Sequence, residues 1–76
     1  MRNETVNGWE FSYDESNNVY ECRGSMHYYN EQDEVPEPSL WRAALKLAEE
    51  LNERGINARA NHSEKGWVEV EIRDTN

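Results

Sequence analysis

The most reactive side chains in this sequence are one thiol and two imidazoles. Cys22 is the single cysteine, and His27 and His62 are the two histidines. A cysteine beside a histidine is a common arrangement for nucleophilic catalysis. Cys22 and His27 lie five residues apart in a segment that alternates like a β-strand, so their side chains point to opposite faces. We therefore expect Cys22 to be a small buried apolar residue, with no catalytic residues and no enzymatic activity.

The titratable groups also lack the spacing of a metal site. The sequence contains no Cys-x-x-Cys or His-x-x-x-His pair, which are spacings that commonly hold zinc. The run Glu31-Gln32-Asp33-Glu34 offers carboxylates to calcium, but it lacks the alternating oxygen ligands and central glycine of a calcium loop. The four glycines are scattered and form no phosphate-binding loop. The sequence therefore predicts neither a metal ion nor a cofactor.

Carboxylates are the most numerous charged groups. Sixteen acidic residues and eight basic residues give a formal net charge of −8. This charge opposes binding to nucleic acid, which depends on Lys and Arg, and binding to anionic membranes. It favours a basic protein partner and speeds encounters with it at low salt. Solubility is a second explanation of the acidity, and adaptation to high salt is a third.

The acidity is concentrated in the first half of the chain. Residues 1–40 carry nine acids and two bases, whereas residues 41–76 carry seven acids and six bases. Carboxylates spaced along a strand and a loop imitate phosphate charges and fit a groove lined by Arg and Lys. We expect seven carboxylates to make electrostatic contacts with a partner: Glu10, Glu21, Glu31, Asp33, Glu34, Glu69 and Glu71.

Aromatic residues are frequent for so short a chain, with three Trp, four Tyr and one Phe. Tyr29 and Trp67 fall at positions that face outward in the predicted strands, where such side chains serve as anchors of protein interfaces. The alternative is that they cover the ends of the sheet. An RNA-binding sheet also presents aromatic residues, but it needs positive surroundings, and here the surroundings are negative.

Two segments show the alternation of apolar and polar residues that is typical of half-buried strands. In the first segment, residues 9–13 and 20–28 flank a polar turn. In the second segment, residues 56–60 and 68–72 also flank a polar turn. Each segment predicts a β-hairpin. Residues 30–37 between them are acidic and contain a proline, which predicts an exposed loop.

A helix is predicted over residues 38–54. Pro38 suits the first turn, and Gly55 suits the left-handed residue that ends a helix. The apolar stripe has helical spacing and consists of Leu40, Ala44, Leu47, Ala48 and Leu51, with Trp41 and Leu45 widening it on one side.

These elements predict an α+β fold in which one helix packs on one face of a four-stranded antiparallel sheet of two hairpins, in the order ββαββ. The strand order within the sheet does not follow from the pattern. The residues expected to face the helix are Trp9, Phe11, Tyr13, Tyr20, Cys22, Met26, Tyr28, Ile56, Ala58, Val68, Val70 and Ile72.

The length bounds the organisation of the chain. Seventy-six residues predict a single small domain over residues 1–76, with residues 1–7 and 74–76 as frayed ends. The single cysteine excludes an internal disulfide, and no apolar run suits a signal peptide or a membrane span. We therefore expect a cytoplasmic protein, in the host cytoplasm if the gene is viral. A homodimer formed through a sheet edge is compatible with the pattern.

The sequence favours a non-enzymatic acidic protein that occupies a basic, nucleic-acid-binding surface of a protein partner without contacting nucleic acid itself. Small phage inhibitors of host defence complexes, such as anti-CRISPR, anti-restriction and glycosylase-inhibitor proteins, are often of this size and charge. That is a likeness of type, because the sequence carries no motif of those families. The alternative hypothesis is a small accessory or adaptor subunit that binds a protein partner through an aromatic patch or a sheet edge.

Overall fold

The computed structural model describes residues 2–23, 26–28, 34–36, 38–62 and 67–73. These residues form strands and one helix, in the order β1 (Glu4–Val6), β2 (Trp9–Asp14), β3 (Val19–Arg23), β4 (Met26–Tyr28), β5 (Glu34–Pro36), α1 (Pro38–Glu53), β6 (Asn57–His62) and β7 (Trp67–Arg73).

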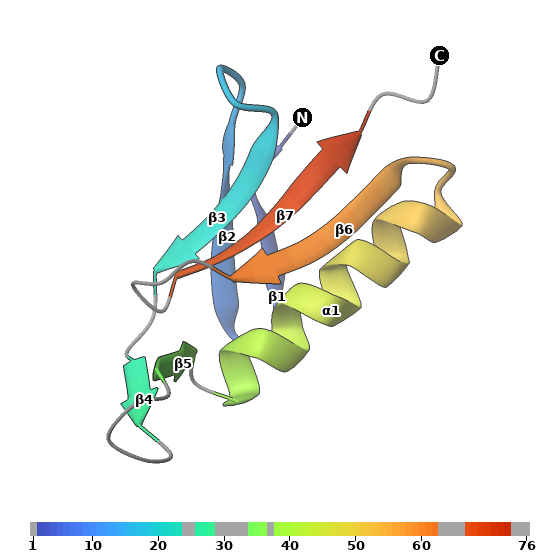
Figure 1. Cartoon of the computed structure of the whole chain (residues 1–76). Helices are drawn as coiled ribbons and strands as arrows, with labels where there is room; N and C mark the ends of the chain where they lie inside the picture. The colour runs from blue at the N-terminus through green and yellow to red at the C-terminus, as the bar shows by residue number, and fades with distance from the viewer. Residues whose placement is uncertain (1, 24–25, 29–33, 37, 63–66, 74–76) are drawn as a thin grey trace.

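The main sheet has five antiparallel strands in the order β1-β2-β3-β7-β6. It curls around α1, which contacts β6, β7 and β1 (Figure 1). Strand β7 thus lies between β3 and β6 and joins the two predicted hairpins into one sheet. The α+β class and the single helix on one face of an antiparallel sheet are confirmed. The prediction of four strands is wrong, because β1 adds a fifth strand.

Strand β1 is formed by residues that we expected to be frayed. Asn7 and Gly8 both have positive φ, 51° and 84°, which is the conformation of a two-residue type I′ hairpin turn. This turn pairs Val6 with Trp9 and brings β1 alongside β2. Val6 is buried against the core, and its burial holds the edge strand in place. Residues 74–76 lie outside the described residues.

The second predicted strand, residues 20–28, is interrupted. Strand β3 ends at Arg23, which pairs with Trp67, the first residue of β7. Strand β4 does not continue β3 in the main sheet, because it pairs with β5 in a separate two-stranded ribbon. Residues 34–36, which we predicted to be part of a loop, are therefore a short strand. The rest of that predicted loop, residues 30–33 and 37, lies outside the described residues.

Helix α1 has the predicted extent within one residue. It ends at Glu53, and Gly55 follows with φ of 85°. The Ile56 N–H donates to the Leu51 carbonyl at 2.9 Å, and the Gly55 N–H donates to the Asn52 carbonyl at 3.0 Å, which is the Schellman arrangement. The predicted stripe is buried, together with Ala43. Leu45 does not widen the stripe as predicted, because it is 47% exposed.

The core fills the space between α1 and the concave face of the sheet. Six of the twelve strand residues predicted to face the helix are buried there: Phe11, Tyr20, Cys22, Ala58, Val68 and Val70. Trp9, Tyr13, Ile56 and Ile72 are half-buried around this cluster. The side chains of Met26 and Tyr28 lie outside the described structure. The observed inward positions confirm the alternation read from the strands.

Two asparagines fasten the main chain of different elements to one another. The Asn52 amide donates to the Ala58 carbonyl and accepts from the Ala58 N–H, both at 3.0 Å. Asn18 accepts a hydrogen bond from the Tyr13 hydroxyl and donates from its side chain to the Ile72 carbonyl at 3.0 Å. The Ile72 N–H in turn donates to the Asn18 carbonyl at 3.0 Å. These bonds tie α1 to β6, and the β2–β3 turn to β7.

The β2–β3 turn is also organised by Asp14. Its carboxylate accepts from the Ser16 N–H at 2.9 Å and from the Asn17 side-chain amide at 2.8 Å. These bonds favour the ionised carboxyl, and the Asn17 amide contributes most to lowering the pKa of Asp14 below its ordinary value.

The lowered pKa predicts how the stability contributed by Asp14 depends on pH. Because the folded pKa lies below the unfolded one, the contribution is complete above the unfolded value of about 3.9 and is lost as pH falls through the folded pKa. We expect wild type to be more stable than Asp14→Asn at pH 7, and the two to converge in acid. Urea unfolding of both proteins between pH 7 and pH 2 measures this difference, and a constant difference across that range would contradict the assignment.

Candidate functional site

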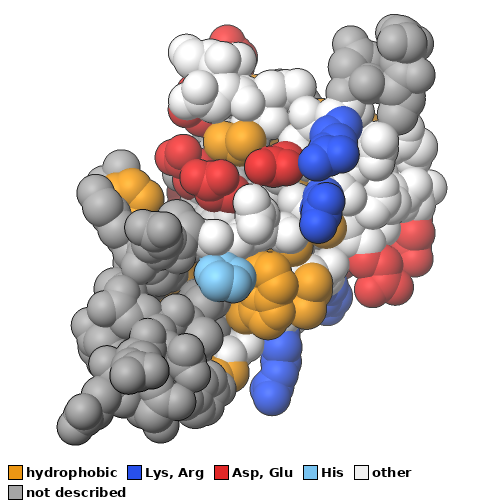
Figure 2. All heavy atoms as spheres, in the orientation of Figure 1, with side chains coloured by type: hydrophobic (Ala, Val, Ile, Leu, Met, Phe, Trp, Pro, Cys, Tyr) orange, Lys and Arg blue, Asp and Glu red, His pale blue; other side chains and the backbone are white. Residues whose placement is uncertain are grey.

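Four predicted contact residues lie on the sheet face opposite α1, which we call the acidic face: Glu10, Glu21, Glu69 and Glu71. Each alternates with core residues in its strand, and successive side chains of a strand point to opposite faces. Glu21, for example, lies between the buried Tyr20 and Cys22. Figure 2 shows acidic side chains gathered over this face of the sheet. The fold therefore brings together carboxylates from β2, β3 and β7.

The centre of the acidic face is a pair of like charges. Glu21 of β3 and Glu69 of β7 are directly opposite in the antiparallel register. Their Cβ atoms are consequently about 5 Å apart. Their cross-strand neighbours on the outer sides are Ser12 and Asn61, which are uncharged. Like charges in directly opposite positions destabilise a sheet, so the fold itself gains nothing from this pair.

Glu71 has a different environment from Glu21 and Glu69. The Arg73 guanidinium lies 3.7 Å from its carboxylate, and Arg59 is its cross-strand neighbour on β6. Among the described residues, the other ion pair joins Arg54 to Glu4. Neither pair includes Glu21 or Glu69, so among the described side chains neither carboxylate of the opposed pair has an ion-pair partner.

The remaining predicted contacts are not part of the described acidic face. Glu34 lies in β5, opposite Tyr28, and its side chain is outside the described structure. Glu31, Asp33 and Tyr29 lie outside the described residues. Trp67 begins β7 on the same strand parity as Glu69, opposite Arg23, and it is half-buried. The structure thus brings together four of the seven predicted carboxylates and places one predicted aromatic anchor at their margin.

Cys22 has the buried position that its sequence context predicts. It is 7% exposed and lies in the core cluster. Burial, and secondarily the negative charge of Glu10, raise the pKa of the thiol. A raised pKa lowers the fraction of thiolate, which is the nucleophilic form. Across the described ranges, no group of three or more His, Cys, Asp and Glu side chains is arranged to hold a metal ion.

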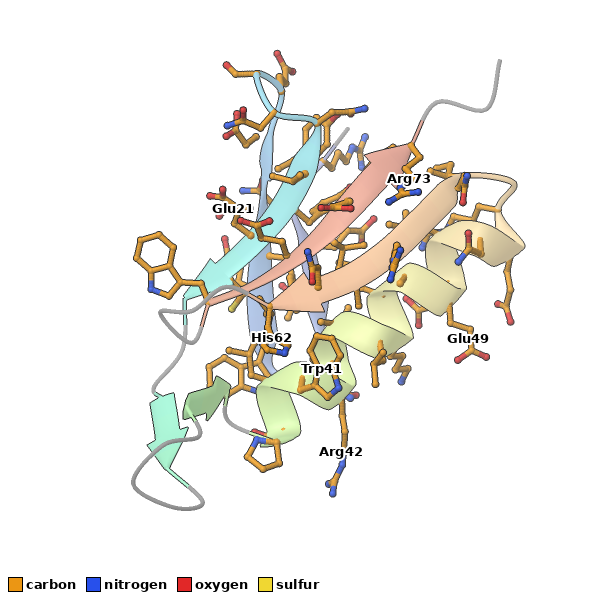
Figure 3. The ribbon with its side chains drawn as sticks, viewed as in Figure 1. Glu21, Trp41, Arg42, Glu49, His62 and Arg73 are labelled. Carbon is orange, nitrogen blue, oxygen red and sulfur yellow. The ribbon has the colours of Figure 1, made fainter. Side chains whose placement is uncertain are left out.

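A second surface was not identified from the sequence. We call it the Trp41 flank, and it consists of Trp41, Arg42, Leu45 and Lys46 of α1 with His62 at the end of β6. The Trp41 and His62 rings meet edge to face with centroids 5.5 Å apart (Figure 3). Leu45 is the one exposed large hydrophobic residue among those described. The sequence does contain a signal for the Trp41 flank: residues 38–48 include two basic residues and no acidic residue in a strongly acidic chain.

In comparisons with known proteins, no family model, curated protein or solved structure matches this chain. In the part of the chain that the structure describes, α1 is too short and too polar to cross a membrane.

Proposed function

We propose that this chain is a non-enzymatic binding protein whose acidic face occupies a basic surface of a protein partner. The observation that carries the proposal is the opposed Glu21–Glu69 pair at the centre of that face. The pair costs the sheet stability, and an Arg or Lys of a partner placed between the two carboxylates reverses that cost.

The kind of partner surface that fits the acidic face is one that binds nucleic acid. Such surfaces are lined by Arg and Lys that neutralise regularly spaced phosphates. The acidic face offers carboxylates about 5 Å apart across strands and about 7 Å apart along β7, on a scaffold that holds them in register. An inhibitor of a nucleic-acid-handling host defence complex, of the anti-CRISPR or DNA-mimic type, is the specific form of the proposal. The net charge of −8 supports fast encounter with such a surface.

A pull-down from host lysate tests the proposal. The tagged protein is expected to retain a nucleic-acid-handling complex at low salt and to release it at high salt or on addition of DNA or RNA. The double variant Glu21→Gln/Glu69→Gln is expected to bind that complex at least about tenfold more weakly. The same variant is expected to have a higher urea midpoint. Its free energy of unfolding should rise by up to about 1 kcal/mol, because the repulsion between the two carboxylates is removed.

The matched control is Glu49→Gln/Glu53→Gln, which removes the same charge from α1, away from the acidic face. This control is expected to keep its affinity within about threefold. Binding that is indifferent to salt and to nucleic acid would exclude the proposal. Equal losses of affinity in the two double variants would show that net charge matters and that the acidic face does not.

The second candidate function is a small adaptor that binds a protein partner through an aromatic patch or a sheet edge. The β6 edge is partly closed, because the Asn52 side chain already occupies the main-chain groups of Ala58. The observation in favour of an adaptor is the Trp41 flank, where the exposed Leu45 adjoins the half-buried Trp41.

A further inference from the structure

The Trp41 flank combines an apolar ridge with a cationic one. Trp41 and Leu45 are four residues apart on α1, so their side chains are neighbours along one ridge of the helix. Arg42 and Lys46 form the adjoining ridge with the same spacing. Figure 2 shows the apolar side chains beside the pale-blue His62 and near basic side chains, apart from the acidic residues of the sheet.

The apolar part of the flank has one buried edge and one open edge. Trp41 is half-buried, packs against the core cluster and contacts His62 with its ring. Leu45 lies one helical turn after Trp41, and 47% of its surface is exposed to solvent. A large apolar side chain of a partner that covers Leu45 would therefore extend an existing cluster, which is the usual setting of an interface anchor.

The charges of the flank are not those that would stabilise the helix best. Acidic residues favour the first turn of a helix because of the helix dipole, yet the first turn of α1 carries none, in a chain with sixteen acids. The two ion pairs of the described residues include neither Arg42 nor Lys46. Lys46 makes one long contact, 3.5 Å from its Nζ to the Asn7 side-chain oxygen. Both cations are exposed, so an acidic ligand can reach them, and Glu49 lies three residues from Lys46 on the same helix.

From these observations we infer that the Trp41 flank is a second binding surface, and that it takes a short acidic polypeptide segment with a large apolar side chain. The apolar side chain lies on Leu45 and Trp41, and its flanking carboxylates pair with Arg42 and Lys46. A long polyanion such as RNA, or an anionic membrane, extends beyond the flank to the rest of a chain of net charge −8, which repels it. A short segment brings fewer charges close to the other carboxylates, because its charges end near the flank and those more than about 8 Å away are largely screened at physiological salt.

This inference concerns a surface separate from the acidic face and does not depend on the proposed function. The experiment is an NMR titration of the full chain with the synthetic hexapeptide Glu-Glu-Leu-Leu-Glu-Glu. Saturable shifts are expected at the Trp41 indole N–H, the Leu45 methyls and the His62 ring. The substitution Leu45→Glu, at an exposed helix position, is expected to weaken binding at least about tenfold, and so is Arg42→Glu/Lys46→Glu.

The control variant Glu21→Gln/Glu69→Gln should bind the hexapeptide at least as well as wild type, which separates this result from the test of the acidic face. The absence of saturable shifts, or shifts that persist in Leu45→Glu, would overturn the inference. So would equal binding of a peptide with Lys in place of each Glu. Stronger shifts of Trp41 and His62 with single-stranded RNA or with anionic vesicles would show that the ligand class is wrong.

Discussion

Replacing Asn18 by alanine is expected to lower the free energy of unfolding by about 3 kcal/mol. The side chain joins the Tyr13 hydroxyl to the Ile72 carbonyl, and each of these part-buried bonds contributes about 1 kcal/mol. Asn18 also has φ of 58°, in the left-handed region that alanine adopts at a cost of about 1 kcal/mol. A chain of 76 residues has about 4 to 11 kcal/mol of stability in total, so the loss is a large fraction of it.

A glycine at the same position separates the two contributions. Asn18→Gly loses the side-chain bonds but adopts positive φ freely, so we expect it to be about 1 kcal/mol more stable than Asn18→Ala. Tyr13→Phe removes one of the two bonds and should lose about 1 kcal/mol. Urea midpoints at equal m-values give these differences. Wild-type stability in Asn18→Gly would mean that the side chain does not fasten the turn to β7.

The local elements could be predicted because each is encoded within a few residues. The helix followed from the spacing of its apolar stripe and from Pro38 and Gly55, and the structure confirms its bounds within one residue. The β1 hairpin also had a local signal, Asn7-Gly8 between Val6 and Trp9, and it was overlooked because residues 1–7 are mostly polar. Asn-Gly is a strong type I′ turn signal even when one flanking strand is short.

Pairing between distant segments could not be predicted in the same way. The position of β7 between β3 and β6 depends on burial across the whole sheet, because alternation fixes which face a residue takes and leaves the neighbouring strand undetermined. The separate β4–β5 ribbon has the same origin, because the alternation does not specify that Met26–Tyr28 pairs with Glu34–Pro36.

For the candidate site, too, local features could be predicted from the sequence, whereas features that depend on pairing between distant segments could not. That Glu21 and Glu69 face away from the helix followed from strand parity, whereas their direct opposition required the register of β3 on β7. The Trp41 flank was missed because Leu45 fits the apolar stripe by helical spacing. Its exposure depends on how α1 is rotated against the sheet, and helical periodicity alone specifies that rotation only to within about one residue position.

Replacing Asn52 by alanine is expected to have two effects, one on stability and one on association. Asn52 holds both main-chain groups of the buried Ala58, and its loss leaves a donor and an acceptor without a protein partner. Unsatisfied groups of this kind cost about 1–3 kcal/mol, and water entering at the margin of β6 keeps the expected loss near about 2 kcal/mol. Urea unfolding measures this loss, with Glu53→Ala as the control for helix propensity at the neighbouring position.

The effect on association follows from the position of β6 at the edge of the sheet. Unpaired main-chain groups on an edge strand can pair with a second chain, and a side-chain amide bound to Ala58 occupies that place in the wild type. Asn52→Ala should therefore self-associate at concentrations where wild type does not, as measured by sedimentation velocity. Asn52→Asp can still accept from the Ala58 N–H but cannot donate to its carbonyl, so it should show an intermediate loss of stability. An Asn52→Ala protein that is as stable as wild type and sediments identically would show that the amide does not protect this edge.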